Sequence, residues 1–204
     1  MNSQQKISNM VLAAVFTAII IVMSFTPLGY LRVGFVSISF MTIPVAIGAI
    51  LLGPVYGAYF GLLFGITSFI QCFTGDLFGA ALVAINPAFT AVMCIIPRIC
   101  IGLVCGLIAR AIKKNIPAFL TASMCAPLTN TALFMGFMMI LFYNNPEFHT
   151  SLASLGIAGY TNLWSLLWIM IGVNGIIEFF VCGIVSFGIA SPLSHAFAHL
   201  QRSK

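Results

Sequence analysis

The chain has 204 residues, of which 61% are hydrophobic and 5% are charged, and its formal net charge is +5. Soluble globular domains carry about 25% charged residues, so the composition excludes that class and indicates a polytopic membrane protein. Six of the eight Lys and Arg residues lie at residue 6, residues 110–114 and residues 202–204, a distribution that favours membrane topology over nucleic-acid binding.

Apolar blocks separated by turn residues predict an all-α membrane protein, in which residues 1–204 form a single domain of six transmembrane helices. The first predicted helix covers residues 8–25 and ends before Thr26. Within it, Ala14 and Ala18 form a strip of small side chains that lets another helix approach closely. On spacing alone, ordinary packing inside the bundle explains this strip equally well.

The next part of the chain is predicted to fold as an external loop followed by a helical hairpin. Residues 28–40 are irregular and contain an arginine that would be costly in lipid, so we expect a loop folded against the bundle. Residues 41–52 and 55–72 are the second and third predicted helices, with Gly53-Pro54 as the break between them. Glycine recurs every four or five residues here, which predicts close packing of helix backbones.

The second half of the chain supplies three more predicted helices. Residues 74–86 form a second external segment, with Asp76 as a solvated loop acid, and a fourth helix begins at Pro87. The fifth helix covers residues 116–142, and the sixth begins after a polar outer loop, residues 143–163. An even number of spans places the three basic positions on one side, so the positive-inside rule predicts that both termini are cytoplasmic.

Polar side chains inside the predicted spans indicate a binding site. Arg98 lies twelve residues before Arg110, and a rise of 1.5 Å per residue puts it about 18 Å deeper in the membrane. An ionisable residue at that depth is a functional-site hypothesis. Asn174 and Glu178 are four residues apart, so they share a face of the sixth helix. Further residues expected to contribute to substrate binding are Gln71, Asn86, Asn130, Trp168 and Tyr30.

These polar residues fall in the outer half of the bundle, where they can hold a small, polar, anionic solute beneath the external segments. Two alternatives stay open. Arg98 and Glu178 can instead neutralise each other as a structural ion pair. Trp168 also fits an aromatic anchor at the membrane interface.

Other kinds of chemistry find little support in the sequence. The six cysteines are scattered, and His195 and His199 lack a third ligand, so we expect no metal and no cofactor. A membrane-embedded enzyme would use Glu178 as base and Arg98 as oxyanion stabiliser, but no Ser/His, Cys/His or paired-carboxylate arrangement supports it, and we expect no enzyme. A secondary transporter driven by protons through Glu178 is the other alternative, although no internal repeat is evident.

With these residues in place, the sequence resembles the substrate-binding S component of energy-coupling factor (ECF) vitamin transporters. The likeness covers nearly the whole chain. It is carried by the order of several short motifs: Ala14-x-x-x-Ala18, IGAILLGP at residues 47–54, PRICIGLVCGLI at residues 97–108 and LTNT at residues 128–131. The resemblance implies that the Ala14-x-x-x-Ala18 strip docks on a transmembrane coupling subunit. It also implies that two cytoplasmic ATPases drive the cycle and that the S component topples to carry its ligand inward.

The resemblance also bears on the ligand and the location. This chain has no G-x-x-x-x-G-K-[ST] loop, which agrees with ATP hydrolysis on other subunits. Arg98 suits a carboxylate through bidentate hydrogen bonds. The pattern of the fourth and sixth helices is most similar to members assigned to pantothenate, and folate, riboflavin or another vitamin stays open. We therefore expect a multi-pass protein of a bacterial plasma membrane, in contact with lipid and without nucleic acid.

Overall fold

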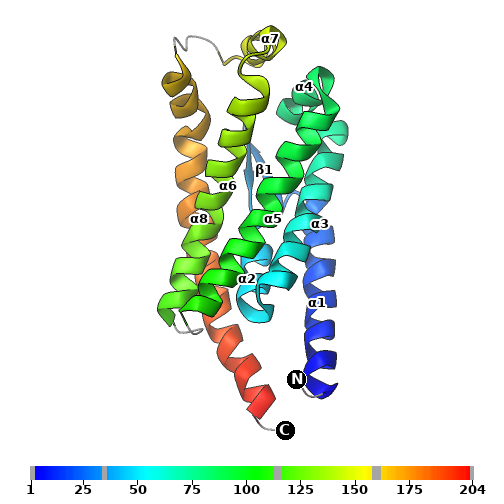
Figure 1. Ribbon diagram of the computed structural model, residues 1–204, viewed down its shortest axis with the longest axis vertical. Coiled ribbons are helices and arrows are strands. Elements are labelled where there is room, and N and C mark those ends of the chain that lie inside the picture. The colour runs from blue at the N-terminus through cyan, green and yellow to red at the C-terminus, as the bar shows by residue number, and fades with distance from the viewer. Residues whose placement is uncertain (1–2, 34–35, 113–115, 158–161, 203–204) are drawn as a thin grey trace.

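The computed structural model describes residues 3–33, 36–112, 116–157 and 162–202. Within these ranges the chain forms long helices, short helices and one β-hairpin (Figure 1). In chain order the elements are α1 (Ser3–Ser24), β1 (Tyr30–Val33), β2 (Val36–Ser39), α2 (Thr42–Leu52), α3 (Pro54–Thr74), α4 (Leu77–Ile85), α5 (Pro87–Ala111), α6 (Ile116–Phe142), α7 (Pro146–Ser154) and α8 (Leu163–Arg202).

Five helices of the described chain are long and apolar enough to cross a membrane, namely α1, α3, α5, α6 and α8. The protein is therefore a multi-pass membrane protein by the length and composition of its helices. The sixth predicted span is not confirmed, because α2 has 11 residues. At 1.5 Å per residue it rises about 16 Å, roughly half of the apolar thickness of a bilayer. The hairpin lies above α2 in the bundle (Figure 1).

The predicted loop at residues 28–40 is wrong as secondary structure, because much of it forms this hairpin. The two strands pair antiparallel, from Tyr30 opposite Ser39 to Val33 opposite Val36. Strand β2 also packs against α8, and Ser39 is buried. The alternation of apolar and polar residues in β2 is the period of a strand. Cross-strand pairing satisfies backbone groups that would otherwise be unpaired inside the bundle.

Both predicted external segments in the second half of the chain contain a short, capped helix. Asp76 precedes α4, and its Oδ2 accepts a hydrogen bond from the backbone N–H of Gly79 at 3.1 Å. Asn145 precedes α7, and its Oδ1 accepts from the N–H of Glu147 at 2.9 Å. These caps satisfy backbone donors in the first turn, so the chain forms helices where only irregular segments were predicted.

The closest approach in the bundle is between α3 and α5, and glycine makes it possible. A Cβ atom added at Gly57 would overlap the backbone of Gly102, and one added at Gly61 would overlap the carbonyl of Arg98. Only glycine fits where two backbones touch. The predicted glycine packing is therefore confirmed, and the seam fixes the height of Arg98 relative to α3.

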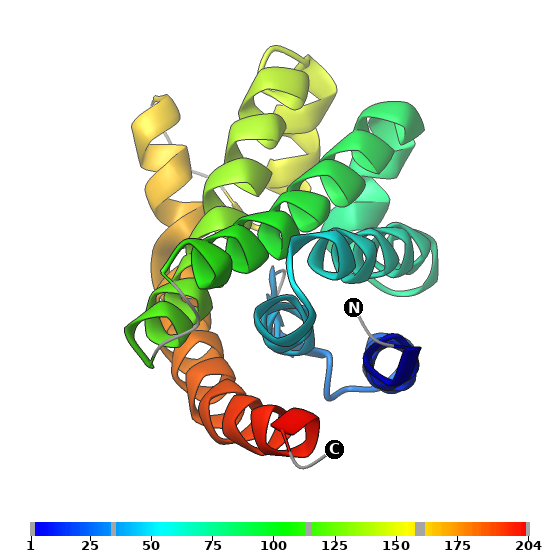
Figure 2. The ribbon, with the colours of Figure 1, turned by 60° about the horizontal axis from the view of Figure 1, so that its bottom comes forward.

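Helix α1 lies at the edge of the bundle, where it packs on α2 and α3 (Figure 2). Much of its outer surface is apolar and exposed, including Met10, Val11 and Val22. Two apolar clusters fill the interior. One includes Phe60 and lies among α1, α2, α3, α5, α6 and α8, whereas the other lies among α4, α5, α6, α7 and α8. Phe78, Leu82 and Met93 of the second cluster, and Tyr30 beside the first, border the cavity described next.

Candidate functional site

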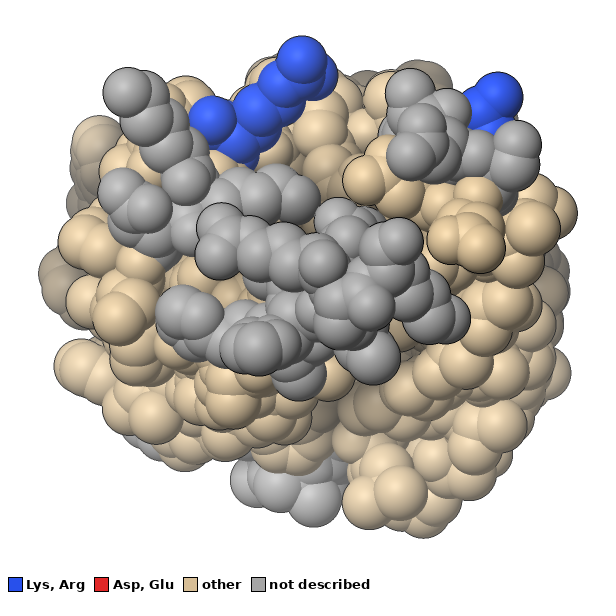
Figure 3. All heavy atoms as spheres, turned by 90° about the horizontal axis from the view of Figure 1, so that it is seen from below, with Lys and Arg blue, Asp and Glu red and all other residues tan. Residues whose placement is uncertain are grey.

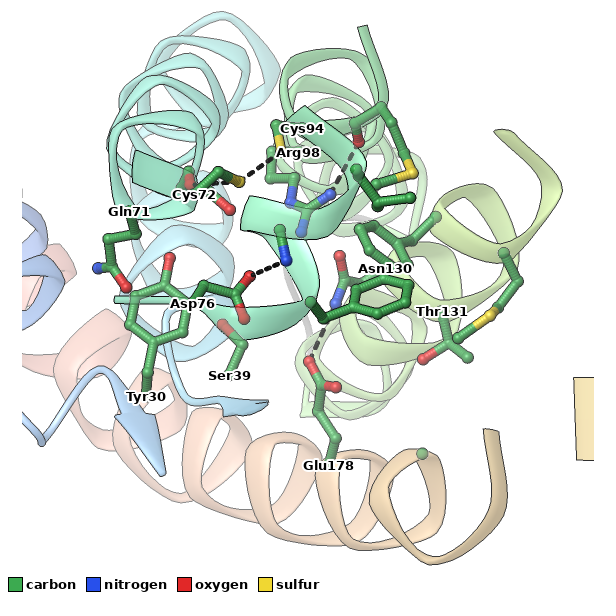
Figure 4. A pocket seen from close by; sticks show the side chains of 18 residues that line it. Tyr30, Ser39, Gln71, Cys72, Asp76, Cys94, Arg98, Asn130, Thr131 and Glu178 are labelled. Atoms are coloured by element: carbon green, nitrogen blue, oxygen red, sulfur yellow. Dashed lines mark hydrogen bonds between the residues drawn. The ribbon is translucent and has the colours of Figure 1, made fainter. Parts of the chain in front are cut away.

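A cavity lies where the hairpin, α3, α4, α5, α6 and α8 come together (Figure 4). The cavity has a volume of about 120 Å³, counted as the space open to the centre of a water-sized sphere. By that measure a single water needs roughly 10–15 Å³, so the space suits a small organic molecule. The polar side chains in its wall are Tyr30, Ser39, Ser68, Gln71, Cys72, Asp76, Cys94, Arg98, Asn130, Thr131 and Glu178. Five of the residues predicted from the sequence are thus brought together.

Arg98 comes from the middle of α5 and is only 7% exposed. Its guanidinium carbon lies 4.7 Å from the ring centroid of Phe134 and 5.4 Å from that of Phe64, so two aromatic rings hold the cation in place. One nitrogen, Nη1, donates a hydrogen bond to the carbonyl of Met93 at 2.9 Å. The Nε atom is buried and has no hydrogen-bond partner in the part of the chain that the structure describes.

Glu178 comes from α8 and is 8% exposed. Its Oε1 accepts a hydrogen bond from Nδ2 of Asn130, on α6, at 3.0 Å. The other end of the Asn130 amide, Oδ1, is buried and has no hydrogen-bond partner among the described residues. Among the described residues, Arg98 bonds to the Met93 carbonyl and Glu178 bonds to Asn130, and the two do not bond to each other. The alternative of a direct structural ion pair between Arg98 and Glu178 is therefore wrong.

Four buried atoms in the cavity wall are thus left with unused hydrogen-bonding capacity within the described chain: Oη of Tyr30, Nε of Arg98, Oδ1 of Asn130 and Oγ of Ser39. Buried polar groups are nearly always paired in folded proteins, and each unpaired one costs about 1–3 kcal/mol. Here they occur around one space. A molecule bound in the cavity would lie beside the four residues that carry them.

Gln71 and Tyr30 form one side of the cavity. The Gln71 side-chain nitrogen donates to the backbone carbonyl of Ser24, which joins α3 to the end of α1. The Tyr30 ring lies 6.4 Å from the Phe64 ring, centroid to centroid. Both residues also border a second, outer cavity between the ends of α1 and α3. They therefore separate the main cavity from this outer space.

Two residues expected in the site lie elsewhere, and the side chain of a third is outside the described residues. Asn86 caps α5, where its Oδ1 accepts from the N–H groups of Ala88 and Phe89 at 3.0 and 3.1 Å, and it is not in the cavity wall. Trp168 is 74% exposed and also outside the wall, which fits an interfacial anchor. Asn174 lies one turn before Glu178 in α8, and its side chain is outside the described residues, as are those of His195 and His199.

Several wall residues escaped prediction from the sequence. Asp76 was expected to be a solvated loop acid, but it is half-buried and lines the cavity. The alternation of apolar and polar residues in β2 is the signal that could have identified Ser39, but the sequence analysis interprets this stretch as part of a loop. Phe134 carries no signal, because an aromatic residue within an apolar span is indistinguishable from ordinary core.

The Ala14 and Ala18 strip lies on the exposed surface of α1. It therefore does not serve to pack α1 within the bundle. Its use as a docking surface stays a prediction.

Among the described residues, the wall combines one cation, Arg98, with the carboxyl groups of Asp76 and Glu178, amide groups and apolar side chains, which is the chemistry of a binding pocket. Among the described residues, no group of three or more His, Cys, Asp or Glu side chains is placed to hold a metal ion. A search of curated proteins finds no match to the chain. A family model described as "ECF transporter, substrate-specific component" matches residues 8–190, which is most of the chain. This match agrees with the order of the motifs and with the buried cavity, and the protein therefore belongs to the family of ECF transporter substrate-specific components.

Proposed function

We propose that the protein is the high-affinity substrate-binding subunit of an ATP-driven ECF importer and that its cavity binds a small anionic vitamin, with pantothenate favoured. The family supports a small-molecule substrate and a transport role rather than an enzymatic one. Folate, riboflavin and other vitamins are the alternatives. In this proposal the whole chain, residues 1–204, is one integral-membrane domain.

The observation that carries the proposal is the state of Arg98. It is a buried cation held between two rings, with one nitrogen paired to a backbone carbonyl and Nε unpaired among the described residues. Arginine presents several N–H donors in a fixed plane that matches a carboxylate. A ligand carboxylate would both neutralise the buried charge and fill this unused donor position.

The opposite part of the wall suits a hydroxyl or amide group. Asn130 offers an unpaired acceptor, Ser39 offers an unpaired hydroxyl, and Glu178 supplies a further carboxylate oxygen beside them. Apolar side chains fill much of the remaining wall, among them Phe78, Leu82 and Met135. Pantothenate combines a carboxylate, an amide, hydroxyls and a branched apolar carbon in one small molecule. Folate is much larger, and riboflavin has no carboxylate.

The distribution of charge supports a cytoplasmic location for both termini. Lys6 lies in the first turns of α1 and Arg110 in the last turn of α5, at the lower end of the molecule. Seen from that end, the described surface shows Lys and Arg but no Asp or Glu (Figure 3). The acids Asp76 and Glu147 belong to the opposite end, beside α4 and α7. With the basic end in the cytoplasm of a bacterial cell, the cavity lies toward the outer side.

The same orientation leaves room for six crossings if β2 and α2 together count as one. Strand β2 has 4 residues and α2 has 11. The strand is roughly 13 Å long and the helix roughly 16 Å long, so together they come close to the 30 Å thickness of a bilayer core. We propose that α1, through Ala14 and Ala18, meets the transmembrane coupling subunit, and that two cytoplasmic ATPases then drive toppling of the bundle.

Mass spectrometry of small molecules retained by the purified protein tests the ligand. Pantothenate is the expected finding, and titration calorimetry with pantothenate should then give tight binding to the wild type. The Arg98→Ala variant should lose that binding, whereas the matched Arg110→Ala variant, at the basic end, should keep it. Tight binding of a ligand without an anionic group would contradict the proposal.

A proton-driven transporter is the second possibility, because Glu178 is a buried acid facing the cavity. Uptake into vesicles separates the two. Uptake that requires ATP and the coupling subunits supports the ECF proposal, whereas uptake by the isolated chain under a proton gradient would refute it.

A further inference from the structure

A pair of thiols lies in the wall of the cavity and has no part in the function proposed above. Cys72 on α3 and Cys94 on α5 place their Sγ atoms 3.9 Å apart, and both residues are buried (Figure 4). Both also line the cavity, so a small molecule that enters it can reach them.

A short movement separates the two sulfur atoms from bonding distance. A disulfide bond is about 2.05 Å long, so the sulfurs must approach by roughly 1.9 Å. The α3–α5 seam already brings the two backbones together at Gly65, which lies beside Cys94 and two turns before Cys72, and at Gly61, which lies beside Arg98, one turn after Cys94. Cys72 Sγ also donates a weak hydrogen bond to the Ser68 carbonyl at 3.4 Å.

We propose that Cys72 and Cys94 form a dithiol modification site, which a small peroxide such as hydrogen peroxide converts to a disulfide from within the cavity. One sulfur attacks a peroxide oxygen, the O–O bond breaks, and a sulfenic acid and water form. The second sulfur then attacks the first and displaces the oxygen as a second water. Two thiols and one peroxide thus give one disulfide and two waters, with the thiols oxidised and the peroxide reduced.

This modification acts on the cavity through α4. A Cβ atom added at Gly79 would lie 2.5 Å from Cys72 Sγ and 2.6 Å from Asp76 Oδ2, so this sulfur packs directly against the start of α4 and its capping residue. Helix α4 contributes Phe78 and Leu82 to the cavity wall. Moving the sulfur toward Cys94 removes this support. The oxidised protein therefore holds α4 less firmly and binds its ligand more weakly, and the effect on ligand binding rests on the proposed function.

Other cysteines provide controls. Cys100 is on α5 like Cys94, but it is only half-buried and lies outside the cavity wall. Cys105 donates to the carbonyl of Ala122 at 3.3 Å and is also outside the wall. A Cys100→Ser variant is therefore a matched control for Cys94→Ser. Both variants remove one thiol from α5, but only Cys100→Ser leaves the proposed pair intact.

Peptide mapping of the full-length protein in detergent tests the disulfide without any ligand. The protein is treated with hydrogen peroxide, denatured, alkylated and digested without reduction. A peptide pair joined through Cys72 and Cys94 is expected in the wild type and in Cys100→Ser, and it should disappear with dithiothreitol and in Cys72→Ser. Free, alkylated Cys72 and Cys94 after a treatment that oxidises the Cys100 thiol would overturn the proposal.

Hydrogen–deuterium exchange tests the effect on α4 independently of the ligand. Amides of residues 77–85 should exchange faster in the oxidised wild type than in the reduced one, and peroxide should leave their exchange unchanged in Cys72→Ser. Equal exchange in a fully disulfide-bonded sample would refute the coupling to α4.

Calorimetry with pantothenate then measures the effect on binding, where we expect the oxidised form to bind at least about tenfold more weakly and dithiothreitol to restore the affinity. Unchanged affinity in the disulfide-bonded protein would refute the link to binding. Absence of pantothenate binding to the reduced protein would instead reject the proposed ligand, while the mapping and exchange results would stand.

Discussion

Asn130 and Glu178 meet across the interface between α6 and α8, where Asn130 Nδ2 donates to Glu178 Oε1 at 3.0 Å. The two residues are 48 positions apart in the sequence. Their hydrogen bond uses the donor end of the amide and leaves the acceptor end in the cavity wall, unpaired within the described chain. Because the Asn130 donor is used by Glu178, the amide presents a hydrogen-bond acceptor to a ligand in the cavity.

Replacing Glu178 with Gln should keep this hydrogen bond, because the Gln side-chain oxygen can still accept from Asn130. Binding of pantothenate should weaken by less than about tenfold, since the charge that neutralises the ligand belongs to Arg98. Uptake with the ATPases and coupling subunit should continue. Vesicle uptake is the measurement, and Asn130→Leu, which removes both amide ends, is the contrasting variant with a much larger expected loss. Complete loss of uptake in Glu178→Gln would favour the proton-driven alternative.

Replacing Arg98 with Ala should weaken binding of an anionic ligand by at least about 30-fold. Removal of one member of a buried charged pair costs about 2–5 kcal/mol, much of it from the charge left unpaired. The Arg98→Lys variant should recover only part of the affinity, because an ammonium lacks the planar set of donors. Calorimetry measures both, and copurification with the coupling subunit should be unaffected. Wild-type affinity in Arg98→Ala would remove this residue from the site.

Replacing Gly61 with Ala should destabilise the protein and disturb Arg98 together. The new methyl group would overlap the Arg98 carbonyl, so α3 and α5 must separate. Overpacking of this kind costs about 1–3 kcal/mol, which lowers the Tm by roughly 2–12 °C in a chain of this size. Gly136→Ala is the control, because a Cβ there meets nothing within 4 Å. Equal Tm values for the two variants would show that the seam relaxes freely.

The sequence was sufficient for the long helices and for much of the polar layer of the site. The predicted ranges 55–72, 87 onward and 116–142 agree with α3, α5 and α6 because apolar length is a strong signal in a membrane protein. Depth along a helix follows from residue counting, which is why Arg98 and Asn130 were placed at a common level. Counting gives height, however, and says nothing about which face a residue occupies.

The parts that could not be predicted depend on contacts between distant segments. Asn86 has the right height but caps α5, because an Asn before a proline-led helix satisfies local N–H groups first. The hairpin was missed because strands of four residues carry little signal and only the surrounding helices make such a strand stable. The nearness of Cys72 and Cys94 follows from how α3 crosses α5, which no local pattern encodes.

Enlarging Ala14 or Ala18 to Leu should leave ligand binding unchanged and prevent assembly with the coupling subunit. Both alanines are exposed on α1, away from the cavity wall, so added bulk meets no neighbour inside the protein. Against a partner helix the same bulk holds the two backbones apart, because small residues are what permit close approach in a membrane. Ala132→Leu is the matched control, since Ala132 is an exposed alanine on α6. Copurification of the complex from membranes is the measurement, with pantothenate calorimetry on each free variant. Normal complex formation by both Ala14→Leu and Ala18→Leu would mean that the coupling subunit docks on another surface.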